Sequence, residues 1–139
     1  MRVVNISSGS EGNMTYIESD EAKILVDLGI TCKQAEEKLE FLGINPREIS
    51  CILITHEHVD HIKGVDAFSH KYDTPVFAHH EVWYGLDAKL KKVSLMNRKM
   101  FDGDKFGFRD HTHTGRLLSQ IQSVSSSRNA CLTILSSNE

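Results

Sequence analysis

The chain has 139 residues, of which 40% are hydrophobic and 25% charged, and its net charge is −3 with neutral histidines. This is the composition of one globular domain that can bury a core. A mildly acidic chain is not an electrostatic nucleic-acid binder by default, so contact with nucleic acid would need a local basic patch or a metal ion. The N-terminal residues lack the apolar run of a signal peptide, and no segment approaches the roughly 18–20 apolar residues of a membrane span.

The cysteines indicate the compartment. Cys32, Cys51 and Cys131 are an odd number and show no CxxC spacing. This argues against a disulfide framework and predicts a reducing, cytoplasmic location. Cys51 begins an apolar run, so we expect it to be a small buried hydrophobe.

The first elements in chain order are three short strands, at residues 2–6, 14–18 and 23–27, all rich in β-branched and apolar side chains. The glycine-rich SSGSEGN segment marks a tight loop between the first two. Thr31 is a plausible N-cap for a helix that ends at Gly43.

The second group of elements alternates strands and helices. CILIT at 51–55 is an uninterrupted apolar run, which favours a strand covered on both faces. Residues 62–72 predict a helix, 74–78 a strand and 81–92 an amphipathic helix. FDGDKFGFRD at 101–110 suggests a strand pair. The fold class is therefore α/β (α+β).

The segment 111–139 differs from the rest of the chain. It contains seven of the fourteen serines but only one of the nineteen acidic residues, Glu139. A break this sharp predicts an atypical serine-rich tail that is either disordered or the product of a shifted reading frame. The domain proper would then span residues 1–110.

The sequence THEHVDHIKG follows the CILI strand directly and concentrates metal-binding side chains. His56 and His58 are two residues apart, so in an extended segment they point the same way and can hold one ion. Asp60 and His61 lie where the chain should turn into a helix, which can direct them toward a second ion. Imidazole and carboxylate suit zinc, manganese or iron. Two such ions can activate water and polarise a phosphoryl or carbonyl oxygen.

These motifs resemble the metallo-β-lactamase superfamily, and together with SSGSEGN and ILVDLG at 24–29 they resemble its YycJ/WalJ branch. The resemblance covers about residues 2–108. It implies the N-terminal half of a four-layer αββα sandwich, a mixed sheet with helices on one face. Members of the branch are thought to be metal-dependent phosphodiesterases, with DNA exonuclease activity proposed.

The resemblance also implies residue roles. His56 and His58 would bind the first metal, and Asp60 and His61 the second, with two zinc ions in the complete site and manganese or iron as alternatives. Asp60 would also orient or deprotonate the attacking water, which makes it the catalytic residue. Asp27 would bind no metal itself but would fix the geometry of the cluster by hydrogen bonding. A simple strand-end turn is the alternative for Asp27.

Other polar residues leave alternatives open. Ser8, Ser10 and Asn13 either face the site or form a plain turn. A basic region, defined here as Lys89, Lys91, Lys92, Arg98 and Lys99, either contacts a phosphate backbone or is a solvated helix face.

The family pattern needs further ligands from a C-terminal half. Leu118-Ser119-Gln120 stands where a Ser-His-Asp is expected, and His111 and His113 are better interpreted as exposed tail residues. Losing that half would expose an apolar sheet face and favour dimerisation or aggregation.

Three functions follow from the sequence. The first is a metal-dependent phosphodiesterase or nuclease-like hydrolase, acting on nucleic acid or a small phosphodiester. The second is a hydrolase of a thioester, lactone or cyclic phosphate. The third is a truncated, inactive fragment that binds metal.

Overall fold

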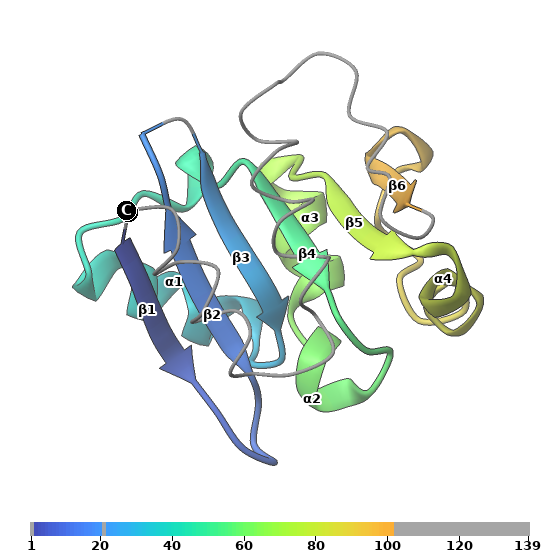
Figure 1. The fold of residues 1–139 in the computed structure, drawn as a ribbon, viewed down its shortest axis with the longest axis horizontal. Coiled ribbons are helices and arrows are strands. Elements are labelled where there is room, and N and C mark those ends of the chain that lie inside the picture. The colour runs from blue at the N-terminus through green and yellow to red at the C-terminus, as the bar shows by residue number, and fades with distance from the viewer. Residues whose placement is uncertain (1, 21, 102–139) are drawn as a thin grey trace.

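The computed structural model describes residues 2–20 and 22–101. They form a six-stranded mixed sheet in which the strands lie side by side in chain order (Figure 1). The pairs β1/β2 and β2/β3 are antiparallel, and the remaining neighbours are parallel. The strands are β1 Arg2–Ser7, β2 Met14–Glu18, β3 Lys23–Leu28, β4 Cys51–Ile54, β5 Val76–His79 and β6 Arg98–Phe101.

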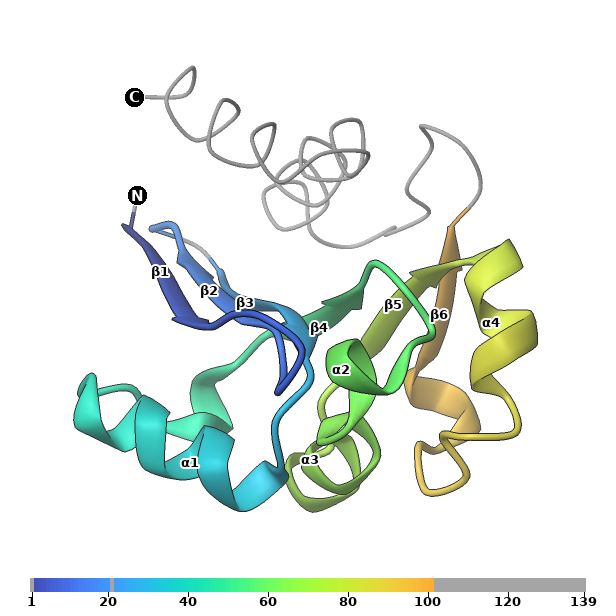
Figure 2. The ribbon, with the colours of Figure 1, turned by 90° about the horizontal axis from the view of Figure 1, so that it is seen from below.

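The helices of the described residues cover one face of this sheet, as expected from the sequence (Figure 2). Each parallel connection passes through helix, because parallel neighbours require a crossover. None of these helices is long and apolar enough to cross a membrane. The helices are α1 Cys32–Phe41, α2 Val59–Ile62, α3 Val65–Tyr72 and α4 His80–Leu86, with 3₁₀ turns η1 Pro46–Glu48 and η2 Leu95–Asn97.

Helix α1 begins where the sequence predicts. The Thr31 side chain accepts a hydrogen bond from the Gln34 backbone, and the Gln34 side chain accepts one from the Thr31 backbone. This capping box satisfies two amide groups that the first turn leaves without helical partners. The helix buries Ala35 and Leu39 against the sheet.

Alternating side chains of the strands build a core on each face of the sheet. On the helical face, strand residues such as Leu25 and Ile52 pack with Leu39, Phe68 and Trp83 of the helices. All four residues of β4 are buried, which confirms that this strand is covered on both faces. The buried cluster of the opposite face consists of Ile17, Ala22, Ile24, Val26, Cys51, Leu53 and Phe77.

The apolar cluster on the face opposite the helices is buried, and the expectation that loss of a C-terminal half would expose such a face stays a prediction. Each residue of the opposite-face cluster is at most 8% exposed. These side chains pack on one another across β2, β3, β4 and β5, with Val3 of β1 against them. Their burial does not by itself decide the oligomeric state, and dimerisation stays a prediction.

Two predicted helices differ from those observed. The single helix expected over 62–72 is broken at Gly64, where a Cβ would overlap the carbonyl oxygen of Ile30. The helix expected over 81–92 ends at Leu86. The strand β6 was not predicted; it pairs with β5, and the Trp83 indole donates to the Lys99 carbonyl at 2.9 Å. Apart from Phe101, the strand pair expected at 101–110 lies outside the described residues, as does the tail 111–139.

A polar cluster joins α1 to α3. The Glu36 carboxylate accepts hydrogen bonds from Lys71 at 2.8 Å, Tyr72 at 2.6 Å and Cys32 at 3.3 Å. The hydrogen bond from Lys71 is the main reason that the pKa of Glu36 falls to about 2. Burial, followed by the contact with Glu36, raises the pKa of Cys32 to about 11. The sequence did not indicate this cluster, because its members come from two helices that are far apart in the chain.

Candidate metal centre

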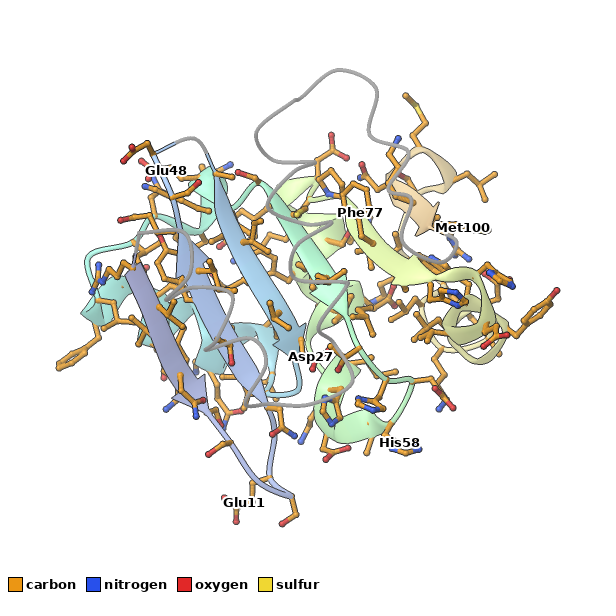
Figure 3. The ribbon with its side chains drawn as sticks, in the orientation of Figure 1. Glu11, Asp27, Glu48, His58, Phe77 and Met100 are labelled. Carbon is orange, nitrogen blue, oxygen red and sulfur yellow. The ribbon has the colours of Figure 1, made fainter. Side chains whose placement is uncertain are left out.

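The histidine-rich loop leaves the C-terminal end of β4 and turns into α2. His56 is exposed in the loop, His58 is the N-cap of α2, and Asp60 and His61 lie within the helix. Figure 3 shows Asp27 and His58 at the same end of the sheet, the end at which ligands of layered α/β folds usually bind.

The three imidazole rings of the loop lie close together. The rings of His56 and His58 are nearly parallel, with an interplanar angle of 16° and centroids 6.1 Å apart. The rings of His56 and His61 have centroids 4.8 Å apart. The short helix therefore brings His61 back toward the extended segment, as the spacing predicts.

Asp27 lies beneath the loop in an unusual backbone conformation. The pairing of β3 with β2 shifts register here, so Asp27 falls in an irregularity of the ladder, with a φ of 62°. Such a bulge re-aims a side chain. The residue is only 5% exposed. Its carboxylate accepts hydrogen bonds from the Thr55 backbone at 2.8 Å, the Thr55 hydroxyl at 2.6 Å and Nδ1 of His61 at 2.7 Å.

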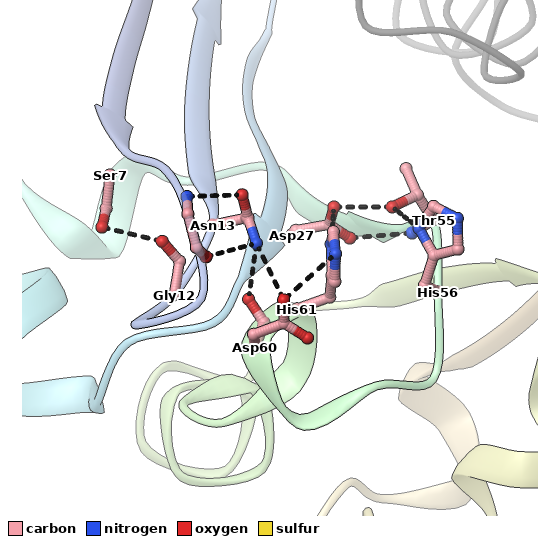
Figure 4. A network of polar contacts seen from close by, with 9 residues as sticks. Ser7, Gly12, Asn13, Asp27, Thr55, His56, Asp60 and His61 are labelled. Carbon is pink, nitrogen blue, oxygen red and sulfur yellow. Dashed lines mark hydrogen bonds and ion pairs between the residues drawn. The ribbon is translucent and has the colours of Figure 1, made fainter.

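These contacts fix the protonated nitrogen of two rings (Figure 4). An ionised carboxylate only accepts, so His61 carries its proton on Nδ1. The single hydroxyl proton of Thr55 goes to Asp27, so Nδ1 of His56 donates to Thr55 Oγ1 at 2.9 Å. In the neutral rings of His56 and His61, Nε2 then carries the lone pair, which is the form that binds a metal.

Asp60 is held from the other side by the SSGSEGN loop. The amide nitrogen of the Asn13 side chain lies 3.3 Å from Oδ2 of Asp60 and 3.2 Å from its carbonyl oxygen. The Asn13 backbone N–H also donates to that carbonyl at 2.7 Å. A Cβ on Gly29 would overlap the Asp60 carbonyl, so this close approach requires glycine.

Helix α4 and the turn that follows it contact the middle of the histidine-rich loop. Nζ of Lys89 donates to the Glu57 carbonyl at 3.0 Å. A Cβ on Gly85 would lie 2.8 Å from Cγ of Glu57, so the helix and the loop are in close contact. Since Glu57 separates His56 from His58, α4 limits the positions that both rings can take.

The donors fit a metal in type and in part in spacing. Nε2 of His61 and Oδ2 of Asp60 are 3.8 Å apart. Two bonds of about 2.0–2.2 Å can span roughly 4 Å, so one ion can lie between these atoms. Within the described residues, however, no three His, Cys, Asp or Glu side chains are grouped closely enough to hold an ion. A complete ligand set therefore needs movement of these side chains or donors from elsewhere.

The structure thus gathers His56, His58, Asp60, His61 and Asp27 at one place. The sequence alone did not predict that the Thr55 hydroxyl links Asp27 to His56. A hydroxyl residue next to His56 could have indicated it. Asn13 was left open between the site and a plain turn, and the structure places its side chain against Asp60. His111 and His113 lie outside the described residues.

The basic region divides in two. The Arg98 guanidinium donates hydrogen bonds to the Asp87 carboxylate and to two backbone carbonyls. Lys89 lies against the histidine-rich loop, and Lys91, Lys92 and Lys99 are exposed.

Two curated bacterial proteins are similar in sequence to this chain. An exodeoxyribonuclease YycJ of Bacillus anthracis is 39% identical over 106 residues, covering 76% of this chain and 40% of that protein. An exodeoxyribonuclease WalJ of Streptococcus pneumoniae is 35% identical over 102 residues, covering 72% of this chain and 38% of the relative. The chain therefore spans about 40% of the length of these curated relatives.

Solved structures show the same fold. A subclass B3 metallo-β-lactamase from a soil metagenome library superposes with a TM-score of 0.57 at 21% identity, over 76% of this chain and 46% of that one. Residues 8–121 match the description "Metallo-beta-lactamase superfamily". The protein belongs to the metallo-β-lactamase superfamily, a family of metal-dependent hydrolases, and resembles its YycJ/WalJ branch.

Proposed function

We propose that the protein is a metal-dependent phosphodiesterase that acts on nucleic acid. The observation that supports this most directly is the hydrogen-bond network of Asp27, which puts the lone pairs of His56 and His61 on Nε2. Nε2 of His61 lies 3.8 Å from Oδ2 of Asp60. The exodeoxyribonuclease relatives supply the substrate class.

In this proposal His56 and His58 hold one ion, and Asp60 and His61 hold a second. Zinc is the first candidate, with manganese or iron as alternatives. When bound, such ions act as Lewis acids that activate water and polarise a phosphoryl oxygen. Asp60 orients the attacking water and accepts its proton on the carboxylate, which makes Asp60 the catalytic residue. Asp27 holds the imidazoles in their ligating form.

The basic region supports a nucleic-acid substrate. Lys89 contacts the histidine-rich loop. After Lys89 in the chain, the exposed side chains of Lys91, Lys92 and Lys99 add positive charge. On a chain with a net charge of −3, such a local patch is what contact with a phosphate backbone requires. A weaker response of DNA hydrolysis to salt in the Lys89→Met variant would agree with this role.

The test is hydrolysis of bis-p-nitrophenyl phosphate and of single- and double-stranded DNA after reconstitution with zinc or manganese. We expect turnover in the wild-type chain and its loss in Asp60→Ala. Asp66→Asn is the matched control, because the hydrogen bonds of the Asp66 carboxylate come from the backbone of Lys92 and Val93, away from the loop.

Other outcomes distinguish the alternatives. Turnover of a thioester, lactone or cyclic phosphate without DNA cleavage would identify a different hydrolase of the superfamily. Bound metal without turnover, unchanged by Asp60→Ala, would identify an inactive metal-binding fragment. Cytoplasmic location and dimerisation are further proposals, tested by cell fractionation and by light scattering of the purified chain.

A further inference from the structure

The SSGSEGN loop makes a side-chain contact with Asp60 that the proposed chemistry does not yet use. We propose that Asn13 is a positioning residue that holds the Asp60 carboxylate in its metal-binding orientation. This inference rests on the proposed function, because it assigns Asn13 a role through a metal ligand.

The hydrogen bonds of Asn13 determine which way its amide points. Its Oδ1 accepts from the Gly9 backbone N–H at 3.2 Å, and a backbone N–H can only donate. The oxygen must therefore face Gly9, and Nδ2 must face Asp60. Nδ2 meets three acceptors, the carbonyls of Gly9 and Asp60 and Oδ2 of Asp60, at 3.1–3.3 Å. Every acceptor is an oxygen, so an amide fits here and a carboxylate would not.

The backbone places Asn13 independently of its side chain. The Asn13 N–H donates to the Asp60 carbonyl at 2.7 Å, and the Asn13 carbonyl accepts from the Gly29 N–H at 2.8 Å. On the same loop, the Ser7 hydroxyl donates to the Gly12 carbonyl at 2.9 Å. Replacing the amide therefore leaves the backbone contact with Asp60 in place and removes the contact with its carboxylate.

The amide and a metal can use Oδ2 of Asp60 together. A carboxylate oxygen has two lone pairs, so one can accept from Asn13 while the other faces Nε2 of His61, 3.8 Å away. The Asp60 side chain is 31% exposed, so without the amide its carboxylate is free to rotate toward water. Asn13 reduces the number of orientations available before an ion arrives, which raises affinity by preorganisation.

The test is a titration of the chain with Co²⁺, followed by calorimetry and by the visible d–d absorption, which reports the ligand geometry. The variants are Asn13→Ala, Asp60→Ala and the double variant. Asn45→Ala is the matched control, because Asn45 also accepts a backbone N–H at a turn, that of Arg47 at the start of η1. Urea unfolding of the metal-free proteins checks the fold, and Asn13→Ser replaces the alanine variant if that variant does not fold.

We expect Asn13→Ala to weaken Co²⁺ binding about 10- to 100-fold and to change the visible band, as loss of an outer hydrogen-bond partner does. Asn45→Ala should match the wild type. In the Asp60→Ala background, the Asn13 change should alter affinity by no more than about twofold, because the group through which it acts is gone.

Two results overturn the inference. One is an Asn13→Ala protein with wild-type Co²⁺ affinity and spectrum. The other is an equal loss in the Asp60→Ala background, which would show a purely structural role for Asn13. Absence of Co²⁺ binding by the wild type would instead overturn the proposed function, and the inference with it, before any variant is compared.

Discussion

Replacing Asp27 with asparagine removes the negative charge of this side chain while keeping its size. Asparagine tolerates the left-handed backbone of Asp27, where φ is 62°, so the turn itself is retained. The side-chain oxygen can still accept from the Thr55 N–H. The new NH₂ group, however, faces the Thr55 hydroxyl and Nδ1 of His61, which both donate in the wild type.

The Thr55 hydroxyl and Nδ1 of His61 must then accept hydrogen bonds instead of donating them. For His61 this changes which ring nitrogen carries the proton. If Nδ1 accepts a hydrogen bond from the NH₂ group of the Asp27→Asn variant, the neutral ring carries its proton on Nε2 and that nitrogen cannot bind a metal. Loss of charge assistance costs about 1 kcal/mol for each of the three hydrogen bonds, about 3 kcal/mol in all. Zinc affinity should fall about 10- to 100-fold, as for other outer partners of metal ligands.

Three measurements follow this variant. Urea unfolding gives the stability change, competition with a chromophoric chelator gives the zinc affinity, and ¹⁵N spectra of the histidines show which nitrogen carries the proton. Asp66→Asn should lose stability and keep its zinc affinity, because its carboxylate serves the backbone of Lys92 and Val93. Unchanged zinc affinity in Asp27→Asn, with His61 still protonated on Nδ1, would refute the reasoning.

Three further changes have expected outcomes. Gly29→Ala places a methyl group on the Asp60 carbonyl and should cost about 3 kcal/mol of unfolding free energy in urea; wild-type stability would contradict the close approach. Gly85→Ala places a Cβ 2.8 Å from Cγ of Glu57, so calorimetry should show weaker zinc binding with a smaller loss of stability; equal affinity would show that the loop yields freely. The pKa of Glu36 is lower in the folded chain than its ordinary value of 4.5. The carboxylate therefore stabilises the fold fully above pH 4.5, and this stabilisation is lost as the pH falls toward about 2. The stability difference between wild type and Glu36→Gln should therefore shrink over that range in urea unfolding, and a difference that stays constant between about pH 5 and pH 2 would contradict this reasoning.

The strands that frame the site could be predicted because their signals are local. Apolar and β-branched runs predicted β1 to β5 to within a few residues, and CILI placed the histidine-rich loop at a strand end. Thr31 marked the start of α1 by a capping pattern that needs no tertiary contact.

The remaining features depend on contacts between distant segments. The strand β6 begins Arg98-Lys99, which carries little strand signal, and it forms because β5 and Trp83 offer partners. The break at Gly64 reflects the nearby Ile30 carbonyl, and the side chain that the bulge at Asp27 re-aims finds its partners in Thr55 and His61. None of these partners can be inferred from the adjoining sequence.

The site was predictable in its ligand types and not in its supporting contacts. The spacing of the four loop residues indicated metal chemistry, whereas the contact of Asn13 with Asp60 joins positions 47 residues apart. The glycine at position 29 was the available clue, since a glycine beside a strand end can mark a close backbone approach.

The most direct test of the central claim is the zinc content of the purified chain, measured by mass spectrometry after dialysis and compared with that of a His56→Ala/His61→Ala variant. We expect the wild type to retain zinc and the variant, still folded by circular dichroism, to lose it. Equal zinc content in the two proteins would contradict the claim that the histidine-rich loop is the metal centre.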